Sequence, residues 1–125
     1  MAKKAEARRE TAEGLGRSLG RLAERLQETG MMREGTVALH LSGSAGGDYH
    51  LETRGRKVQV LDAADAPLDR EVALEIRGDA ETVQAIIDGD KDAAKEFFAG
   101  GIRVRGDLRY LSDVMLELGL LERPL

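Results

Sequence analysis

The sequence contains no cysteine and no tryptophan, and it has only two tyrosines and two phenylalanines among 125 residues. The absence of cysteine excludes disulfides and every reaction that needs a thiolate. No apolar run approaches the roughly 18 residues that cross a bilayer, so no transmembrane helix is expected. Leu, Val, Ile, Ala and Met must therefore build the core, and such a core adapts more readily than one built around rigid aromatic rings.

A surplus of basic residues is also missing, because the formal net charge is −4. No basic patch interleaved with aromatic side chains occurs, so we expect no nucleic-acid partner. The charge is uneven: residues 1–30 carry seven Lys and Arg against five Asp and Glu, whereas residues 31–125 carry 12 against 18. The charged first residues contain no apolar segment of the kind that directs secretion, and we predict a cytoplasmic protein.

Residues for catalysis or metal binding are equally scarce. His40 and His50 are the only histidines, and a zinc site needs three or four ligands. No Gly-x-Ser-x-Gly motif lies at a strand-to-helix turn, where it would mark a nucleophile, since Gly16-Arg17-Ser18-Leu19-Gly20 falls within an amphipathic helical pattern. Asp88, Asp90 and Asp92 cluster at one turn, where solvated helix caps are a simpler interpretation than acid-base catalysis. We therefore predict no enzyme, no catalytic residue, no metal site and no cofactor.

The first 30 residues predict a long amphipathic helix over residues 5–29. Leucines spaced by four, three and four residues form one narrow stripe, which consists of Leu15, Leu19, Leu22 and Leu26. Three glycines within residues 14–20 weaken an isolated helix but permit close packing against a sheet. We expect the stripe to dock on the chain's own body as a monomer, and a weak homodimer through the same leucines is the alternative. Transient membrane contact through this helix is a third possibility, but the glutamates on its polar side weaken any attraction to a membrane surface.

Residues 31–125 are predicted to form the body of a single domain, and the leading helix in residues 1–30 is part of the same domain. Alternation of apolar and polar residues with period two predicts strands, whereas Asp residues ahead of apolar faces with helical period predict capped helices. A loop containing Pro67 is expected over residues 63–69. The predicted elements are strands over residues 36–42, 49–54, 57–62 and 72–77, helices over 79–89 and 90–99, a strand over 102–105 and a final helix over 107–118. This order predicts an α+β fold, in which helices cover one face of a five-stranded, mostly antiparallel sheet.

Residues 73–107 also resemble a known family. They contain, in order, a strand running into a capped helix, the break Ile86-Ile87-Asp88-Gly89-Asp90, the pair Phe97-Phe98 before two glycines, and Ile102-Arg103-Val104-Arg105-Gly106-Asp107 ahead of a Leu-rich helix. This arrangement resembles the sterol-carrier-protein-2 family. The resemblance implies a sterol-carrier-like fold with an apolar tunnel between the sheet and the helices, which takes fatty acyl or sterol-like ligands. It implies no fixed polar anchor for the ligand.

The apolar faces of the predicted elements supply the candidate ligand-binding residues. Periodicity alone does not separate a cavity lining from a filled core, whereas the resemblance favours a cavity. The candidates are Val72, Leu74, Ile76, Ile86, Ile87, Phe97, Phe98, Leu108, Leu111, Val114, Met115 and Leu118. The predicted function is non-catalytic binding or transfer of an apolar lipid. The alternative is an interaction or dimerisation module with a filled core, which serves as an accessory subunit of a larger complex.

Overall fold

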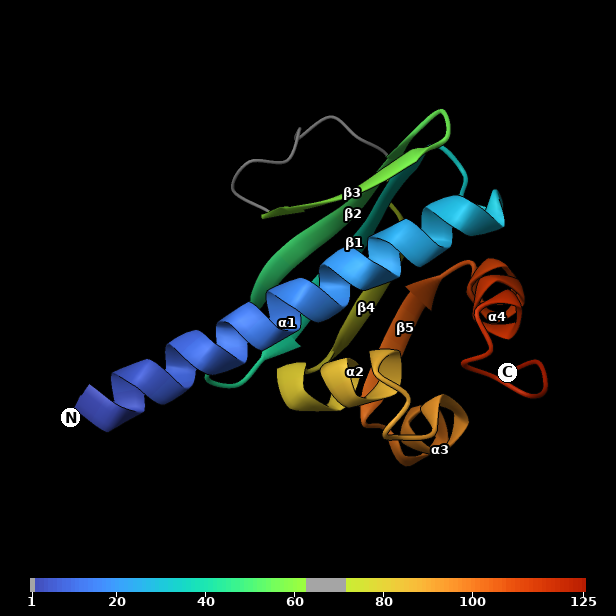
Figure 1. Cartoon of the computed structure of the whole chain (residues 1–125). Helices are drawn as coiled ribbons and strands as arrows, with labels where there is room; N and C mark the ends of the chain where they lie inside the picture. Colours follow the sequence, from blue (N-terminus) through green and yellow to red (C-terminus); the bar gives the residue numbers. More distant parts are fainter. Residues whose placement is uncertain (1, 63–71) are drawn as a thin grey trace.

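The computed structural model describes residues 2–62 and 72–125, with the side chains of the first helix described from Glu13 onward. This part of the chain forms four helices and five strands (Figure 1), namely α1 (Ala2–Thr29), β1 (Gly35–Ser42), β2 (Gly47–Arg54), β3 (Lys57–Asp62), β4 (Val72–Asp79), α2 (Ala80–Ile87), α3 (Ala93–Ala99), β5 (Ile102–Gly106) and α4 (Leu108–Glu117). The predicted elements agree with these bounds to within a few residues. The loop predicted over residues 63–69 lies outside the described residues.

The five described strands form one sheet in the order β3-β2-β1-β4-β5. β2 pairs antiparallel with both β1 and β3, and β4 pairs antiparallel with β5. β4 lies parallel to β1, a neighbour that the sequence did not predict. Alternation identifies the two faces of a strand but not its partners, because parallel and antiparallel strands share the same period. The α+β fold with a mostly antiparallel sheet and a leading helix is confirmed.

One face of the sheet is apolar, and the helices pack against it. The apolar face extends over the three central strands, where Val37 of β1 pairs with Leu51 of β2 and Leu39 of β1 pairs with Ile76 of β4. His40, at an alternate position of β1, belongs to the opposite face. Figure 1 shows α1 lying diagonally across the sheet, and this helix contacts β3, α2 and α4. Helical coverage of one sheet face therefore creates the space in which a core or a cavity forms.

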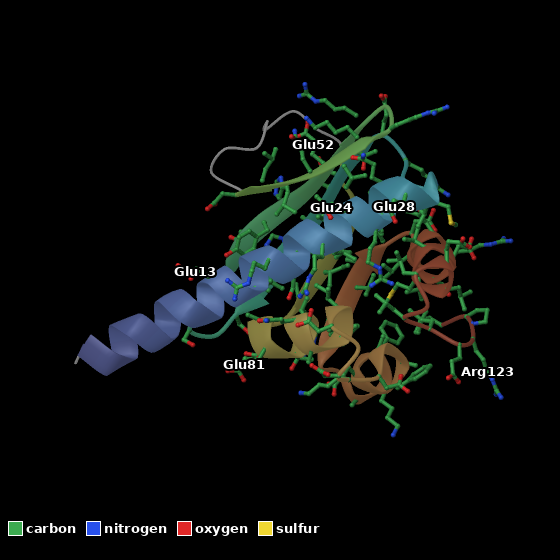
Figure 2. All side chains as sticks on the ribbon, in the orientation of Figure 1. Glu13, Glu24, Glu28, Glu52, Glu81 and Arg123 are labelled. Atoms are coloured by element: carbon green, nitrogen blue, oxygen red, sulfur yellow. The ribbon has the colours of Figure 1, made fainter. Side chains whose placement is uncertain are left out.

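The leucine stripe of α1 packs inside the chain's own core. Leu15 and Leu19 are 0% exposed and Leu26 is also buried, whereas Leu22 is half-buried. A homodimer through these four leucines stays a prediction, and it would require the helix to leave its own sheet first. The exposed side of α1 carries acidic residues, namely Glu13, Glu24 and Glu28 (Figure 2).

Polar contacts also fix α1 to the C-terminal ends of two other helices. The fully buried Ser18 donates its hydroxyl to Asp88 at 2.9 Å, and Arg21 Nη2 forms an ion pair with the same carboxylate at 3.2 Å. Asp88 is the residue that ends α2. Arg25 Nη2 donates to the carbonyl oxygen of Leu118, which ends α4, at 2.6 Å. Because the last carbonyls of a helix lack partners within the helix, the Arg25 contact satisfies a group that α4 leaves unpaired, and both sets of contacts fix the position of a helix end relative to α1.

Aspartates begin three of the described helices. The side chains of Asp79 and Asp107 accept backbone N–H groups of α2 and α4, as the sequence predicts. The cap of α3 is Asp92, which accepts two backbone N–H groups, and the predicted cap at Asp90 is wrong. The interpretation of Asp88 as a solvated cap is also incorrect, since its carboxylate is bound to α1.

The glycines of α1 have different surroundings. A Cβ on Gly14 would lie 3.3 Å from Gln84 Nε2, so this glycine permits close approach of α2. A Cβ on Gly16 or Gly20 would meet nothing within 4 Å in the part of the chain that the structure describes. The expectation that all three glycines permit close packing against the sheet is therefore wrong.

We predict that Gly16→Ala and Gly20→Ala each raise the free energy of unfolding by about 1 kcal/mol, because alanine loses less backbone entropy in a helix and meets no neighbour here. Chemical denaturation followed by circular dichroism measures the change. Gly14→Ala is the matched control and should gain less, because its Cβ presses on Gln84. A loss of stability in Gly16→Ala or Gly20→Ala would contradict the open space around a Cβ at these positions.

Removal of residues 1–30 should destabilise the remaining domain and cause it to aggregate, because the apolar sheet face under Leu15, Leu19 and Leu26 becomes exposed. Light scattering and thermal denaturation of the truncated and full-length chains measure both effects. A truncated chain that is soluble, monomeric and equally stable would show that the docking of α1 contributes nothing to the fold.

Candidate ligand cavity

An apolar cavity of about 100 Å³ lies between the sheet and the helices α1, α2 and α4. Strands β1, β2, β4 and β5 supply its floor and the three helices supply its walls and roof. It is lined by Leu22, Leu26, Met32, Val37, Leu39, Leu51, Leu74, Ile76, Val83, Ile86, Ile87, Ile102, Val104, Tyr110, Leu111, Val114, Met115 and Leu118. Among these residues Tyr110 alone carries a hydroxyl, so the lining offers an apolar environment on every side.

Eight of the candidate residues lie around this cavity, from strand β4 and helices α2 and α4. They are Leu74, Ile76, Ile86, Ile87, Leu111, Val114, Met115 and Leu118. The structure brings them together because β4, α2 and α4 each turn one apolar face toward the same space.

The other four candidates do not line the cavity. Val72, at the start of β4, is 44% exposed, and Phe98 is 76% exposed. Phe97 and Leu108 are half-buried against the edge of the core. The two phenylalanines are on α3, which has only seven residues and packs on the end of β5 rather than over the middle of the sheet. Sequence periodicity identified their apolar character but not this displacement.

Several lining residues were missed by the sequence prediction. Val37, Leu39 and Leu51 occupy the predicted apolar faces of β1 and β2, so the alternation of those strands already contained the signal. Leu22 of α1 was assigned to the docking stripe, and it both docks and lines the cavity. Met32 lies in the connection between α1 and β1, where no periodic pattern marks a core position.

The hydroxyl of Tyr110 is engaged by the chain itself. It accepts the backbone N–H of Arg33 at 2.9 Å and donates to Met32 Sδ at 3.4 Å. The guanidinium of Arg33 stacks 4.3 Å from the centre of the Tyr110 ring and forms an ion pair with Asp107 at 2.9 Å. These contacts join the α1–β1 connection to the first turn of α4. Tyr110 therefore closes one end of the cavity and does not serve as a polar anchor inside it.

The same network affects the charge of Asp107. The backbone N–H of Tyr110, and then the guanidinium of Arg33, hold the pKa of the Asp107 carboxyl below its usual value. Both contacts favour the ionised form, so the carboxylate keeps its role as the N-cap of α4 at neutral pH. Its stabilising contribution is present above the usual carboxyl pKa and is lost only as the pH falls through the lowered value.

The two histidines lie on the polar face of the sheet, away from the cavity. His40 Nδ1 is 2.9 Å from Asp48 Oδ1, and His40 Nε2 is 3.7 Å from Glu75 Oε1. His50 Nδ1 is buried without a hydrogen-bond partner in the described part of the chain. No group of three His, Asp or Glu side chains within residues 2–62 and 72–125 is arranged to hold a metal ion. Over the same ranges, none of the helices combines the length and hydropathy that a bilayer span requires.

The fold is similar to that of several solved structures. Sterol Carrier Protein-2 like-3 from Aedes aegypti matches with a TM-score of 0.55 and 18% identity, over 83% of this chain and 93% of that chain. Sterol Carrier Protein 2 from Yarrowia lipolytica, in its apo form, has a TM-score of 0.50 and 16% identity, over 62% of this chain and 66% of that chain. At such low identities the likeness concerns the fold alone.

An enzyme is also among the similar structures. The stereoselective inverting sec-alkylsulfatase from Pseudomonas sp. matches with a TM-score of 0.52 and 17% identity, over 72% of this chain. The matched part is only 13% of that enzyme, so this chain corresponds to a small portion of it. No curated protein matches the sequence.

The sequence itself also matches a protein family. The profile described as the SCP-2 sterol transfer family aligns with residues 19–116, which extend from the leucine stripe of α1 to the penultimate residue of α4. The match therefore includes the sheet and every element that lines the cavity. The chain belongs to the SCP-2 sterol transfer family, whose members bind sterols or other lipids.

Proposed function

We propose that this protein binds one lipid molecule in the cavity between the sheet and helices α1, α2 and α4, and carries it without chemical change. The observation that carries this proposal is the lining, which is aliphatic or thioether apart from Tyr110, whose hydroxyl is already bonded. A space lined only by apolar atoms accepts apolar ligands. The eight candidate residues that surround the cavity are the proposed ligand contacts.

The cavity must enlarge when a lipid enters. Its volume of about 100 Å³ is below the roughly 300–1,000 Å³ of typical ligand sites. Met32 and Met115 have flexible side chains that adapt to a changed space, so a lining that contains them can deform. We propose α4 and Leu118, which ends it, as the segment that moves, because together they carry four of the proposed ligand contacts.

Burial of the alkyl chain supplies the proposed affinity. A chain of twelve carbons contributes about 9 kcal/mol at ~0.8 kcal/mol per CH₂ group. Immobilising the ligand and displacing the packed lining cancel much of this amount. Micromolar affinity and a broad choice of ligands are therefore expected. The described residues offer no catalytic arrangement in the cavity, so we assign carriage rather than chemistry to this chain, although similar folds also occur within enzymes.

The small volume favours a second candidate function. A cavity of about 100 Å³ is intermediate in volume between the small voids of a filled core and a lipid-binding site. The chain could therefore instead act as an interaction module or accessory subunit. The exposed Phe98 offers an apolar contact to a partner on the outside of α3. The two functions differ in one property, because a filled core takes up no apolar probe.

We predict that the neutral probe N-phenyl-1-naphthylamine binds saturably, with a dissociation constant in the micromolar range, because it can enter an apolar cavity without needing a charged partner. Fluorescence titration of the full-length protein measures binding, and added dodecanol should displace the probe. Absence of a saturable signal up to the solubility limit of the probe would reject lipid carriage and favour the interaction module.

The variant Val114→Phe should weaken binding of this probe at least tenfold, because the larger side chain fills part of the cavity. The existing space accommodates the ring, so the free energy of unfolding should change by less than about 2 kcal/mol. Fluorescence titration and chemical denaturation measure the two quantities. His50→Ala, on the polar face of the sheet, is the control and should leave probe binding unchanged. A Val114→Phe protein that binds the probe normally would place the ligand outside this cavity.

A further inference from the structure

The cavity has a thin wall at the junction of α1 and α2. Leu22 and Ile87 line the cavity on one side, and on the other side they line a surface hollow of about 410 Å³. The remaining residues of this hollow are Arg21, Arg25 and Asp88. Displacement of two aliphatic side chains would therefore join the apolar interior to a surface site with charged walls.

The charge of this hollow is predominantly positive. Arg21 and Arg25 are one helical turn apart on α1, a spacing at which like charges repel each other. The carboxylate of Asp88 is their only acidic neighbour in the hollow, and it is shared between Arg21 and the hydroxyl of Ser18. The two guanidinium groups are therefore matched by one carboxylate.

Arg25 carries the unmatched charge. Its described hydrogen bond goes to the neutral carbonyl oxygen of Leu118 at 2.6 Å, and no ion pair joins Arg25 to an acidic residue within residues 13–62 and 72–125. Glu24 and Glu28, although on the same helix, do not line the hollow. A guanidinium has five N–H donors in a planar fork, which suits bidentate binding of a carboxylate or a phosphate. Arg25 therefore retains both charge and donors for an anion.

We propose that this hollow binds the anionic head group, a carboxylate or a phosphate, of a single-chain amphiphile whose alkyl chain lies in the cavity. This inference rests on the proposed lipid carriage and specifies the class of lipid. Leu22 and Ile87 contact the first carbons of the chain, and Arg21 and Arg25 contact the head group. Sterols and long-chain alcohols, which lack an anionic group, gain nothing from the arginines.

The same contact links head-group binding to opening of the cavity. Arg25 holds the carbonyl of Leu118, the residue that ends α4 and also lines the cavity. An anion that binds the Arg25 guanidinium competes with this carbonyl oxygen for the N–H donors of Arg25. Loss of the hydrogen bond to Leu118 then releases the C-terminal end of α4. The head group thereby weakens the contact that keeps the cavity small.

Displacement of N-phenyl-1-naphthylamine by three twelve-carbon ligands tests the proposal at pH 8, below their micelle concentrations. Dodecanoate and dodecyl phosphate should half-displace the probe at concentrations at least tenfold lower than dodecanol. In the double variant Arg21→Gln/Arg25→Gln this difference should fall to within twofold. Arg17→Gln, which removes the same charge one turn away and outside the hollow, is the matched control and should keep the difference.

Ionic strength provides a measurement that needs no variant. Raising NaCl from 50 to 500 mM should weaken dodecanoate binding severalfold but not dodecanol binding, because salt screens exposed charge pairs. Equal displacement by dodecanol and dodecanoate in the unmodified protein would overturn the head-group site while leaving lipid carriage intact. A preference for dodecanoate that persists in the double variant would also overturn it. If the probe itself does not bind, lipid carriage fails as well.

Discussion

The docking of α1 across the apolar face of the sheet is the interaction on which the rest of the structure depends. Leu15, Leu19 and Leu26 are buried between this helix and the sheet. Gln27 adds a contact to the sheet, because its Oε1 accepts the backbone N–H of Val58 in β3 at 3.1 Å. Since an isolated helix with three interior glycines is marginal, the helix and the sheet stabilise each other.

The position of α1 also determines the cavity and its edge. Leu22 and Leu26 close the space above the sheet, while Arg21 and Arg25, on the neighbouring side of the same helix, reach the ends of α2 and α4. One helix thus supplies both the apolar roof of the cavity and the basic side chains at its rim. The excess of basic residues in the first 30 residues is in part concentrated at this rim, next to the wall formed by Leu22 and Ile87.

The scarcity of aromatic side chains has a consequence for the interior. Neither phenylalanine lines the cavity, and its single tyrosine is fixed at one end by Arg33 and Met32. The remaining lining is aliphatic or thioether, and its two methionines are the most adaptable side chains, so the space can change its volume without a new fold. This property suits a carrier that must both close around a lipid and release it.

Much of this architecture could be predicted from the residues alone, since local chemistry determines local structure. Period-two alternation identified the apolar faces of the strands, the leucine spacing identified the docking face of α1, and Asp79 and Asp107 marked two helix starts. The motifs of residues 73–107 pointed to the family that the profile match confirms. Only the tertiary structure decided that β4 pairs parallel with β1, that α3 carries Phe97 and Phe98 away from the cavity, and that Arg21 and Arg25 meet the ends of α2 and α4. The strand pairing and the two arginine contacts join residues more than 30 positions apart, and the place of α3 depends on how the assembled sheet is covered. No local period or capping preference encodes such contacts.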